Sequence, residues 1–87
     1  MKETTLKIPT IDMEGTGANI LKLREKKGIS VRKLQEYLEF STPQAIYKWQ
    51  HGTALPTIDN LVVLASVLGV RIDDILVVTD TQISLSA

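Results

Sequence analysis

The sequence contains no cysteine, which excludes a disulfide-stapled scaffold and any metal site built on thiolates. Its single histidine, His51, cannot form a zinc site by itself. One histidine also leaves no credible Ser, His and acid set for nucleophilic catalysis. Asp73 and Asp74 are better explained as negative charge near a helix N-terminus than as a metal pair. We therefore expect no enzyme, no cofactor and no metal site.

Long apolar runs are also missing. None approaches the roughly 20 residues that span a bilayer, and the N-terminus MKETTLKIPT lacks the basic-then-apolar order of a signal peptide. We therefore expect a cytoplasmic protein with no membrane partner. The 87 residues are enough for one domain, and an apolar share of 44% is normal for a globular chain. A core of this size is small, which favours dimerisation.

An excess of either charge is missing too, because the net charge is zero. The distribution is nevertheless uneven: residues 22–48 carry a net charge of +4, and the remaining residues carry −4. The basic side chains of that stretch are Lys22, Arg24, Lys26, Lys27, Arg32, Lys33 and Lys48. Such asymmetry suggests one face for a polyanion. A solvated helix surface would give the same pattern, so charge alone leaves both interpretations open.

Apolar periodicity and capping residues predict five short helices joined by brief turns. The expected helices cover residues 16–27, 31–38, 42–50, 57–68 and 72–76. Gly28 and Gly69 follow the first and fourth helices, and Ser30 is a good N-cap for the second. The run Ser41-Thr42-Pro43-Gln44 predicts a hydroxyl cap, a first-turn proline and a capping-box glutamine for the third helix.

The two ends of the chain differ from the middle. Residues 1–15 are rich in Thr and Ile and contain Pro9, which indicates an arm or a short edge strand. Residues 78–87 form a similar tail, and the two segments could pair as a small sheet. We thus expect an all-α, compact five-helix domain over residues 16–77, flanked by the arm and the tail.

The second and third helices have the layout of a helix-turn-helix, whose second helix enters the major groove of DNA. Ile46 and Trp49 lie three residues apart and should face inward. Gln44, Ala45, Tyr47 and Lys48 then remain on or near the outer side. Glutamine can bond an adenine edge in two places, alanine can touch a thymine methyl group, and lysine and tyrosine can hold phosphate. A solvated polar face would look similar.

The runs GANILKLREKKGISVRKLQEYL and FSTPQAIYKWQHGTALPTIDNLVVLASVLGVRIDDIL resemble the Cro/phage-repressor (Xre-like) helix-turn-helix family. The resemblance covers about residues 16–77 and implies a lambda-repressor-like fold that binds double-stranded DNA. The motifs that match in combination are Leu23-Arg24 before Gly28, Ile46 with Trp49 and Gly52, Leu55-Pro56, Asn60-Leu61, Leu64-Ala65, Leu68-Gly69-Val70 and Asp74-Ile75-Leu76.

The resemblance also implies roles for individual residues. Gln44 matches the polar position that begins the family's recognition helix, and Arg32 and Lys33 lie where phosphate contacts are common. The complete set expected to contact DNA is Arg32, Lys33, Thr42, Gln44, Ala45, Tyr47 and Lys48.

The chain also departs from the family pattern. Val31 replaces a frequent glutamine, and Gln35 replaces a small residue. Glu39 stands where the turn usually has glycine, unless that glycine is displaced, and the segment that follows is one residue longer than usual. We therefore expect a reshaped turn. Many relatives pair the arginine of the first helix with a glutamate. Here the partners are Arg24 and Gln50, so a hydrogen bond should replace the ion pair.

Two functions from different classes remain open at this stage. The first is a sequence-specific transcriptional regulator, a repressor that reads DNA as a homodimer. The second is an antitoxin-type or other protein-interaction module on the same fold, with a protein partner held by the N-terminal arm and the C-terminal tail. Tyr47 is balanced between a DNA contact and a partly packed aromatic. His51 is more simply an exposed residue than a phosphate ligand.

Overall fold

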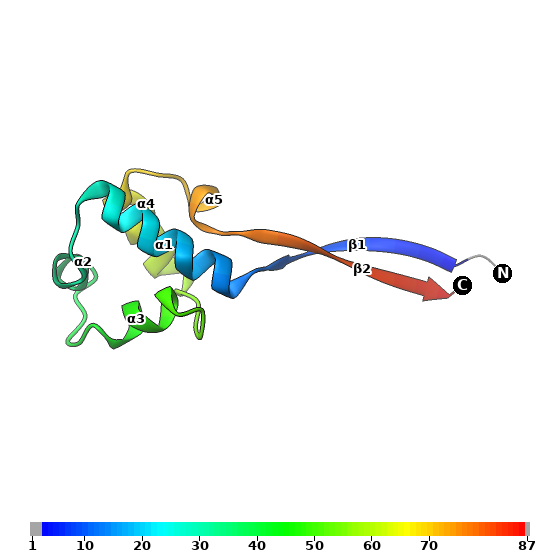
Figure 1. Ribbon diagram of the computed structural model, residues 1–87, viewed down its shortest axis with the longest axis horizontal. Helices are drawn as coiled ribbons and strands as arrows, with labels where there is room; N and C mark the ends of the chain where they lie inside the picture. The colour runs from blue at the N-terminus through cyan, green and yellow to red at the C-terminus, as the bar shows by residue number, and fades with distance from the viewer. Residues whose placement is uncertain (1–2, 87) are drawn as a thin grey trace.

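A computed structural model of the chain describes residues 3–86, and residues 1, 2 and 87 of the predicted arm and tail lie outside this part. Five helices form one body, and the terminal segments leave it together as a two-stranded ribbon (Figure 1). In chain order the elements are β1 (Glu3–Ile11), α1 (Met13–Lys27), α2 (Val31–Tyr37), α3 (Gln44–Gln50), α4 (Ile58–Leu68), α5 (Ile72–Ile75) and β2 (Val78–Ser86). The predicted five-helix architecture is therefore confirmed.

Several helix ends follow the capping residues that the sequence indicated. Gly28 and Gly69 end α1 and α4 in the left-handed conformation, with φ angles of 74° and 68°, which glycine adopts at no steric cost. Ser30 caps α2, because its Oγ accepts a hydrogen bond of 3.0 Å from the backbone N–H of Lys33. Asp74 accepts a backbone hydrogen bond of 2.9 Å at the start of α5. Local chemistry therefore delimits these helices.

The start of α1 differs from the prediction. The helix begins at Met13 rather than at Thr16. Asp12 is its N-cap, and the Asp12 carboxylate accepts a hydrogen bond of 2.9 Å from the backbone N–H of Gly15. The predicted start was wrong because the β-forming pattern of the preceding residues extends up to this cap and obscures it.

The start of α3 also differs. The helix begins at Gln44, so the hydroxyl cap predicted from Ser41 and Thr42 and the capping box at Gln44 are wrong. Pro43 is the N-cap, and its carbonyl accepts the first helical hydrogen bond, 3.2 Å from the N–H of Tyr47. A proline sterically disfavours helical backbone at the residue before it. Thr42 is therefore kept out of the helix.

The core lies between the five helices. Its buried apolar side chains are Ile20, Leu34, Leu38, Ile46, Trp49, Leu61, Leu64, Leu68 and Ile75. Thr16 is also fully buried, and its hydroxyl accepts a hydrogen bond of 2.9 Å from the backbone N–H of Val77. This bond joins α1 to the base of β2. No helix within residues 3–86 has both the length and the apolar character needed to cross a membrane.

The terminal strands pair antiparallel over their full nine residues, from Glu3 opposite Ser86 to Ile11 opposite Val78. The predicted pairing of arm and tail is therefore confirmed. The ribbon projects away from the helical body along the long axis of the molecule (Figure 1), whose extents are 57 × 22 × 19 Å. The radius of gyration of 16.2 Å exceeds the roughly 12 Å of a compact chain of this length.

Candidate nucleic-acid interface

Residues 38–43 join α2 to α3 in a turn with one unusual backbone conformation. Glu39 has a φ of 57°, in the left-handed region that non-glycine residues avoid. The side-chain amide of Gln35 donates a hydrogen bond of 3.1 Å to the carbonyl of Phe40, which ties α2 to the turn. Glu39 itself therefore adopts the conformation that usually calls for glycine, and the reshaped turn stays a prediction. Helix, turn and helix together form a helix-turn-helix.

The inner side of α3 is anchored in the core. Ile46 is fully buried and Trp49 is 4% exposed, so both face inward as predicted. The rings of Phe40 and Trp49 meet edge to face with centroids 5.7 Å apart, an arrangement that aromatic pairs prefer. The turn and the helix are therefore fixed to one another as well as to the core.

A hydrogen bond and a close backbone approach set α3 against α1. Arg24 Nε donates a hydrogen bond of 3.0 Å to Gln50 Oε1 in α3. The Arg24 guanidinium also donates a hydrogen bond of 2.9 Å to the carbonyl of Ile29, just after α1. The predicted Arg24–Gln50 hydrogen bond is confirmed. Gly17 lies directly beneath the end of α3, since a Cβ there would overlap the carbonyl oxygens of Trp49 and Gln50. Only a residue without a side chain allows the two helices to approach this closely.

The outer side of α3 presents three polar side chains in one row. Gln44, Tyr47 and Lys48 are all exposed, and their spacing of three and four residues places them on one helix face. Tyr47 is 44% exposed, so its ring is neither packed in the core nor fully free. Ala45 is half-buried and packs against the core. Its methyl group is therefore less accessible than the sequence led us to expect.

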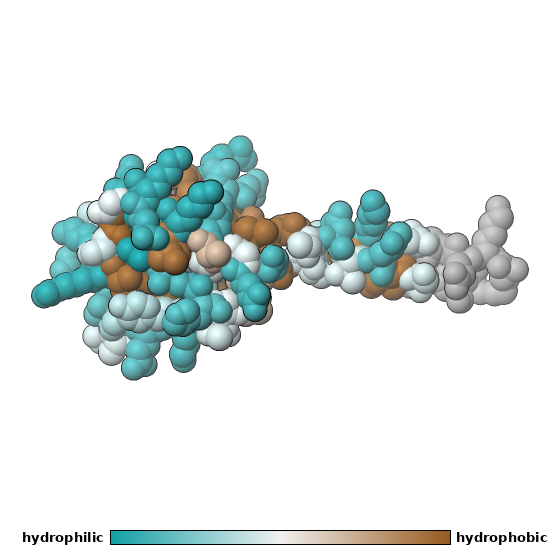
Figure 2. Space-filling model, in the orientation of Figure 1, coloured by the Kyte–Doolittle hydropathy of each residue, from teal (hydrophilic) through white to brown (hydrophobic). Residues whose placement is uncertain are grey.

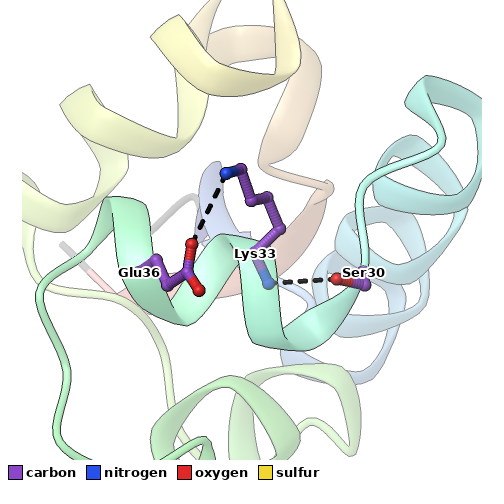
Figure 3. A network of polar contacts seen from close by, with 3 residues as sticks. All are labelled: Ser30, Lys33 and Glu36. Atoms are coloured by element: carbon purple, nitrogen blue, oxygen red, sulfur yellow. Dashed lines mark hydrogen bonds and ion pairs between the residues drawn. The ribbon is translucent and has the colours of Figure 1, made fainter.

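The start of α2 adds two basic side chains. Arg32 and Lys33 are both exposed. Lys33 Nζ lies 3.5 Å from Glu36 Oε2, and it also lies 5.4 Å from the centre of the Tyr37 ring. Figure 3 shows this ion pair beside the Ser30 cap. Exposed pairs of this kind are weak, so Lys33 remains free to turn toward an anion, while Arg32 has no ion-pair partner within residues 3–86.

Thr42 and His51 flank α3. Thr42 is exposed in the turn that precedes the helix, and His51 is the exposed C-cap. Lys26 and Lys27, by contrast, line a shallow hollow beside the end of α4, together with Leu68. The basic stretch of residues 22–48 is therefore divided, because part of its charge lies beside α4 and not on the helix-turn-helix.

Three residues that orient the outer face of α3 were not identified as such from the sequence. Gly17 allows the close approach of α1 and α3, Gln35 holds the turn, and Phe40 packs on Trp49. The signals were present but ambiguous. A glycine inside a helix has many explanations, and the sequence pattern treated Gln35 only as a departure. Contacts between residues far apart in sequence are decided by packing.

The geometry agrees with comparisons to known proteins. A family model described as helix-turn-helix matches residues 20–75, which is more than half of the chain. No curated protein matches the chain in sequence. Three solved structures share its fold, with TM-scores of 0.66, 0.63 and 0.62.

The first is the restriction-modification controller protein C.AhdI from Aeromonas hydrophila, at 20% identity, with 74% of this chain and 96% of that chain covered. The second is the clp gene regulator ClgR from C. glutamicum, at 24% identity over 72% and 80%. The third is the DNA-binding domain of BldD, at 21% identity over 75% and 93%.

These findings define the class of the protein as a helix-turn-helix domain. The chain belongs to the Xre/Cro-type helix-turn-helix family, a family of DNA-binding regulators.

Proposed function

We propose that the protein is a sequence-specific repressor that reads the major groove of DNA with the outer face of α3 and acts as a homodimer. The observation that carries this proposal is the two-sidedness of α3. Ile46 and Trp49 bury its inner side, while Gln44, Tyr47 and Lys48 stand exposed on the outer side. A short helix held in this way presents its polar face to a groove without loss of the core.

Each side chain has a role that its chemistry suits. Gln44 bonds an adenine edge through its amide, and Ala45 touches a thymine methyl group with the part of its surface that remains open. Lys48 and Tyr47 hold phosphates. Thr42, which directly precedes Pro43 and α3, donates a hydrogen bond from its hydroxyl to the backbone of DNA. Arg32 and Lys33, both exposed at the start of α2, contact phosphates.

The homodimer follows from affinity. A single domain with few base contacts has limited affinity, whereas two copies on a palindromic site place their recognition helices about 34–36 Å apart. We keep the predicted division into a DNA-binding domain, residues 16–77, and an arm and tail, residues 1–15 and 78–87, except that the first turn of α1, from Met13, belongs to the domain. We favour repression over activation because repression requires only occupancy of a site.

A second candidate function rests on the ribbon. Leu6, Ile8 and Ile83 are exposed on it by 36–46%, so an antitoxin-type or other interaction module could hold a protein partner there. DNA binding by α3 and partner binding by the ribbon use different surfaces. The two functions are therefore distinguishable by variants of each surface.

Fluorescence anisotropy with labelled duplexes, selected from a random pool, tests the proposal. The logarithm of the binding constant should fall with the logarithm of salt concentration by about 0.9 per phosphate neutralised. Gln44→Ala should cost about 1–3 kcal/mol and relax the preference at one base pair, while Lys48→Ala should weaken all sequences alike and reduce the salt slope by about 1.

Lys26→Ala is the matched control, because it removes the same charge from the hollow beside α4. It should leave the affinity close to that of the wild type. Binding that is absent or independent of salt contradicts the proposal, and so does an equal loss from Lys48→Ala and Lys26→Ala.

A further inference from the structure

The two faces of the ribbon differ in chemistry. Residues directly opposite in an antiparallel pair share a face, and successive residues alternate between faces. The register therefore places on one side a set that we call the neutral face: Leu6, Ile8, Thr10, Thr79, Thr81 and Ile83. The other side, which we call the polar face, carries Thr5, Lys7, Asp80, Gln82 and Ser84, with Ile11 and Val78 at its base. Figure 2 shows hydrophilic side chains on the upper edge of the outer ribbon and a hydrophobic patch on its lower edge, with more hydrophobic surface where the ribbon leaves the helical body.

The neutral face is uncovered. Leu6 is 46%, Ile8 36% and Ile83 37% exposed, and the ribbon projects beyond the helical body (Figure 1). An isolated two-stranded ribbon is at best marginally stable in water and needs packing on one face. The helices that lie at its base do not supply that packing over its outer length. The ribbon therefore lacks a partner for this face.

The polar groups of the neutral face are already satisfied. Thr10 Oγ1 lies 3.3 Å from Thr79 Oγ1 and 3.2 Å from Thr81 Oγ1. Thr10 also donates its hydroxyl to the carbonyl of Thr79 at 3.3 Å. Covering a hydroxyl costs little when it keeps its hydrogen bonds. The charged side chains Lys7 and Asp80 stand on the polar face, so a neutral face can lie against another one without like-charge repulsion.

The outer edges of the ribbon offer a different way to associate. The N–H of Asp12 donates a hydrogen bond of 2.8 Å to the carbonyl of Val77. Along each strand, the backbone N–H groups then point alternately toward the other strand and toward solvent, counted from this bond. By that alternation Pro9 lies at an outward position, where its missing N–H interrupts the edge of β1. The edge of β2 contains no proline. Pairing along this edge, however, would leave the neutral face exposed.

We infer that the neutral face is a self-association surface, on which the same face of a second copy packs face to face. The inference rests on the homodimer proposed above and assigns its interface. The neutral face spans five residues of each strand, 6–10 and 79–83. At about 3.4 Å per residue, with strands about 4.8 Å apart, its footprint is on the order of 150–250 Å² for each copy.

A standard interface buries roughly 800 Å² on each partner. The ribbon contact is smaller, which corresponds to a weak dimer whose population depends on protein concentration. In Figure 1 the ribbon points away from α2 and α3. Two copies joined at their ribbons therefore keep both recognition helices free, and DNA that binds both copies stabilises the contact by mass action.

Sedimentation velocity over a range of protein concentrations, without DNA, tests the inference. Ile83→Lys places a charge on the neutral face, and Ser84→Lys places the same charge one residue away on the polar face. Ile83→Lys should weaken self-association by roughly tenfold or more, since a buried unpaired charge is costly, while Ser84→Lys should match the wild type. Thr81→Lys repeats the test without loss of an apolar side chain, and circular dichroism verifies that each variant is folded.

A third variant, Gln82→Pro, removes an outward N–H from the edge of β2. The face-to-face contact predicts that Gln82→Pro still dimerises. If Gln82→Pro loses the dimer and the lysine variants retain it, the strands pair by their edges and the inference is overturned. If every variant dimerises like the wild type, another surface forms the dimer and the inference is also overturned, although the proposed homodimer stands.

A wild type that stays monomeric over the whole concentration range, both free and on DNA, overturns the inference and the homodimer together. Binding of the monomer to a half-site duplex, measured separately by anisotropy, still reports on the recognition by α3.

Discussion

At position 39 the chain places a glutamate where the backbone is left-handed, with a φ of 57°. For an L-residue with a side chain this conformation costs roughly 1–2 kcal/mol. Glu39 keeps this strained conformation because neighbouring contacts, such as the hydrogen bond from Gln35 to the Phe40 carbonyl, hold the turn in this shape. The turn between α2 and α3 is therefore determined by its surroundings and not by its own preference.

Glu39→Gly should raise the free energy of unfolding by up to about 1 kcal/mol. Relief of the strain exceeds the roughly 0.5–1 kcal/mol that glycine costs through its greater freedom in the unfolded chain. Urea unfolding followed by circular dichroism measures the change. Glu36→Gly, an exposed position inside α2, is the control and should lose about 1 kcal/mol. A loss of stability in Glu39→Gly would contradict the assignment of strain.

Asp59 provides a second test at the residue scale. A hydrogen bond from the Thr57 hydroxyl lowers the pKa of the Asp59 carboxyl below its ordinary value of 3.8. A depressed pKa stabilises the fold above the unfolded value, and the contribution is lost as the pH falls through the folded value. NMR titration should find the pKa of Asp59 below 3.8, and Thr57→Val should raise it. An unchanged midpoint in Thr57→Val would show that the hydroxyl has no influence.

At the element scale, the position of α3 depends on its neighbours. A helix of seven residues is far too short to be stable by itself in water. Its inner side is held by Ile46 and Trp49, and its end is held on α1 by Gly17 and by the Arg24–Gln50 bond. The direction of the outer face of α3 is therefore a property of the packed domain.

Gln50→Ala should lower the free energy of unfolding by about 1.5–3 kcal/mol, the usual contribution of a hydrogen bond to a charged group. Because Gln50 is only half-buried, we expect a loss near the lower figure. The half-buried Arg24 guanidinium would then keep only its bond to the Ile29 carbonyl. Thermal and denaturant unfolding measure the loss. Gln50→Glu, which restores an acceptor for Arg24, should match or exceed the wild type, and equal losses in both variants would refute the role of the bond.

At the scale of the whole molecule, the chain consists of a helical body with its own core and a ribbon outside it. The core side chains all come from the helical region, while the apolar side chains of the ribbon remain partly exposed. Stability should therefore be uneven, because local opening requires least free energy where few apolar contacts are lost.

Hydrogen exchange should show this difference. The N–H groups of Leu6, Ile8 and Thr10 point toward β2, yet in dilute protein they should exchange much faster than those of the core helix α4. Raising the protein concentration should slow their exchange and leave α4 unchanged, since association covers the ribbon. NMR or mass spectrometry follows both regions in one sample. Equal protection of ribbon and core at low concentration would contradict this division of stability.

Much of the fold could be predicted from the sequence, because the start and end of a helix depend on capping interactions among residues a few positions apart. Gly28, Ser30 and Gly69 delimit their helices as expected, and alternating β-forming residues at both ends indicated strands. The failures were also local: Asp12 was hidden behind a strand pattern, and Pro43 excluded Thr42 from α3.

Of the candidate site, residue types and their spacing on α3 could be predicted, and so could the partners Arg24 and Gln50. The accessibility of Ala45, the division of the basic stretch and the close approach at Gly17 could not. These features depend on which helices lie beside one another.

The sequence by itself determined the five helices, the inward side of α3 and the family, because apolar periodicity, capping residues and motif spacing involve residues close together in the chain. Only the tertiary structure decided how far the outer face of α3 is exposed and how this helix is held. It also decided that arm and tail form a ribbon with one neutral face left open. Such properties arise from contacts between residues distant in sequence, whose energies depend on their arrangement in space and not on their order.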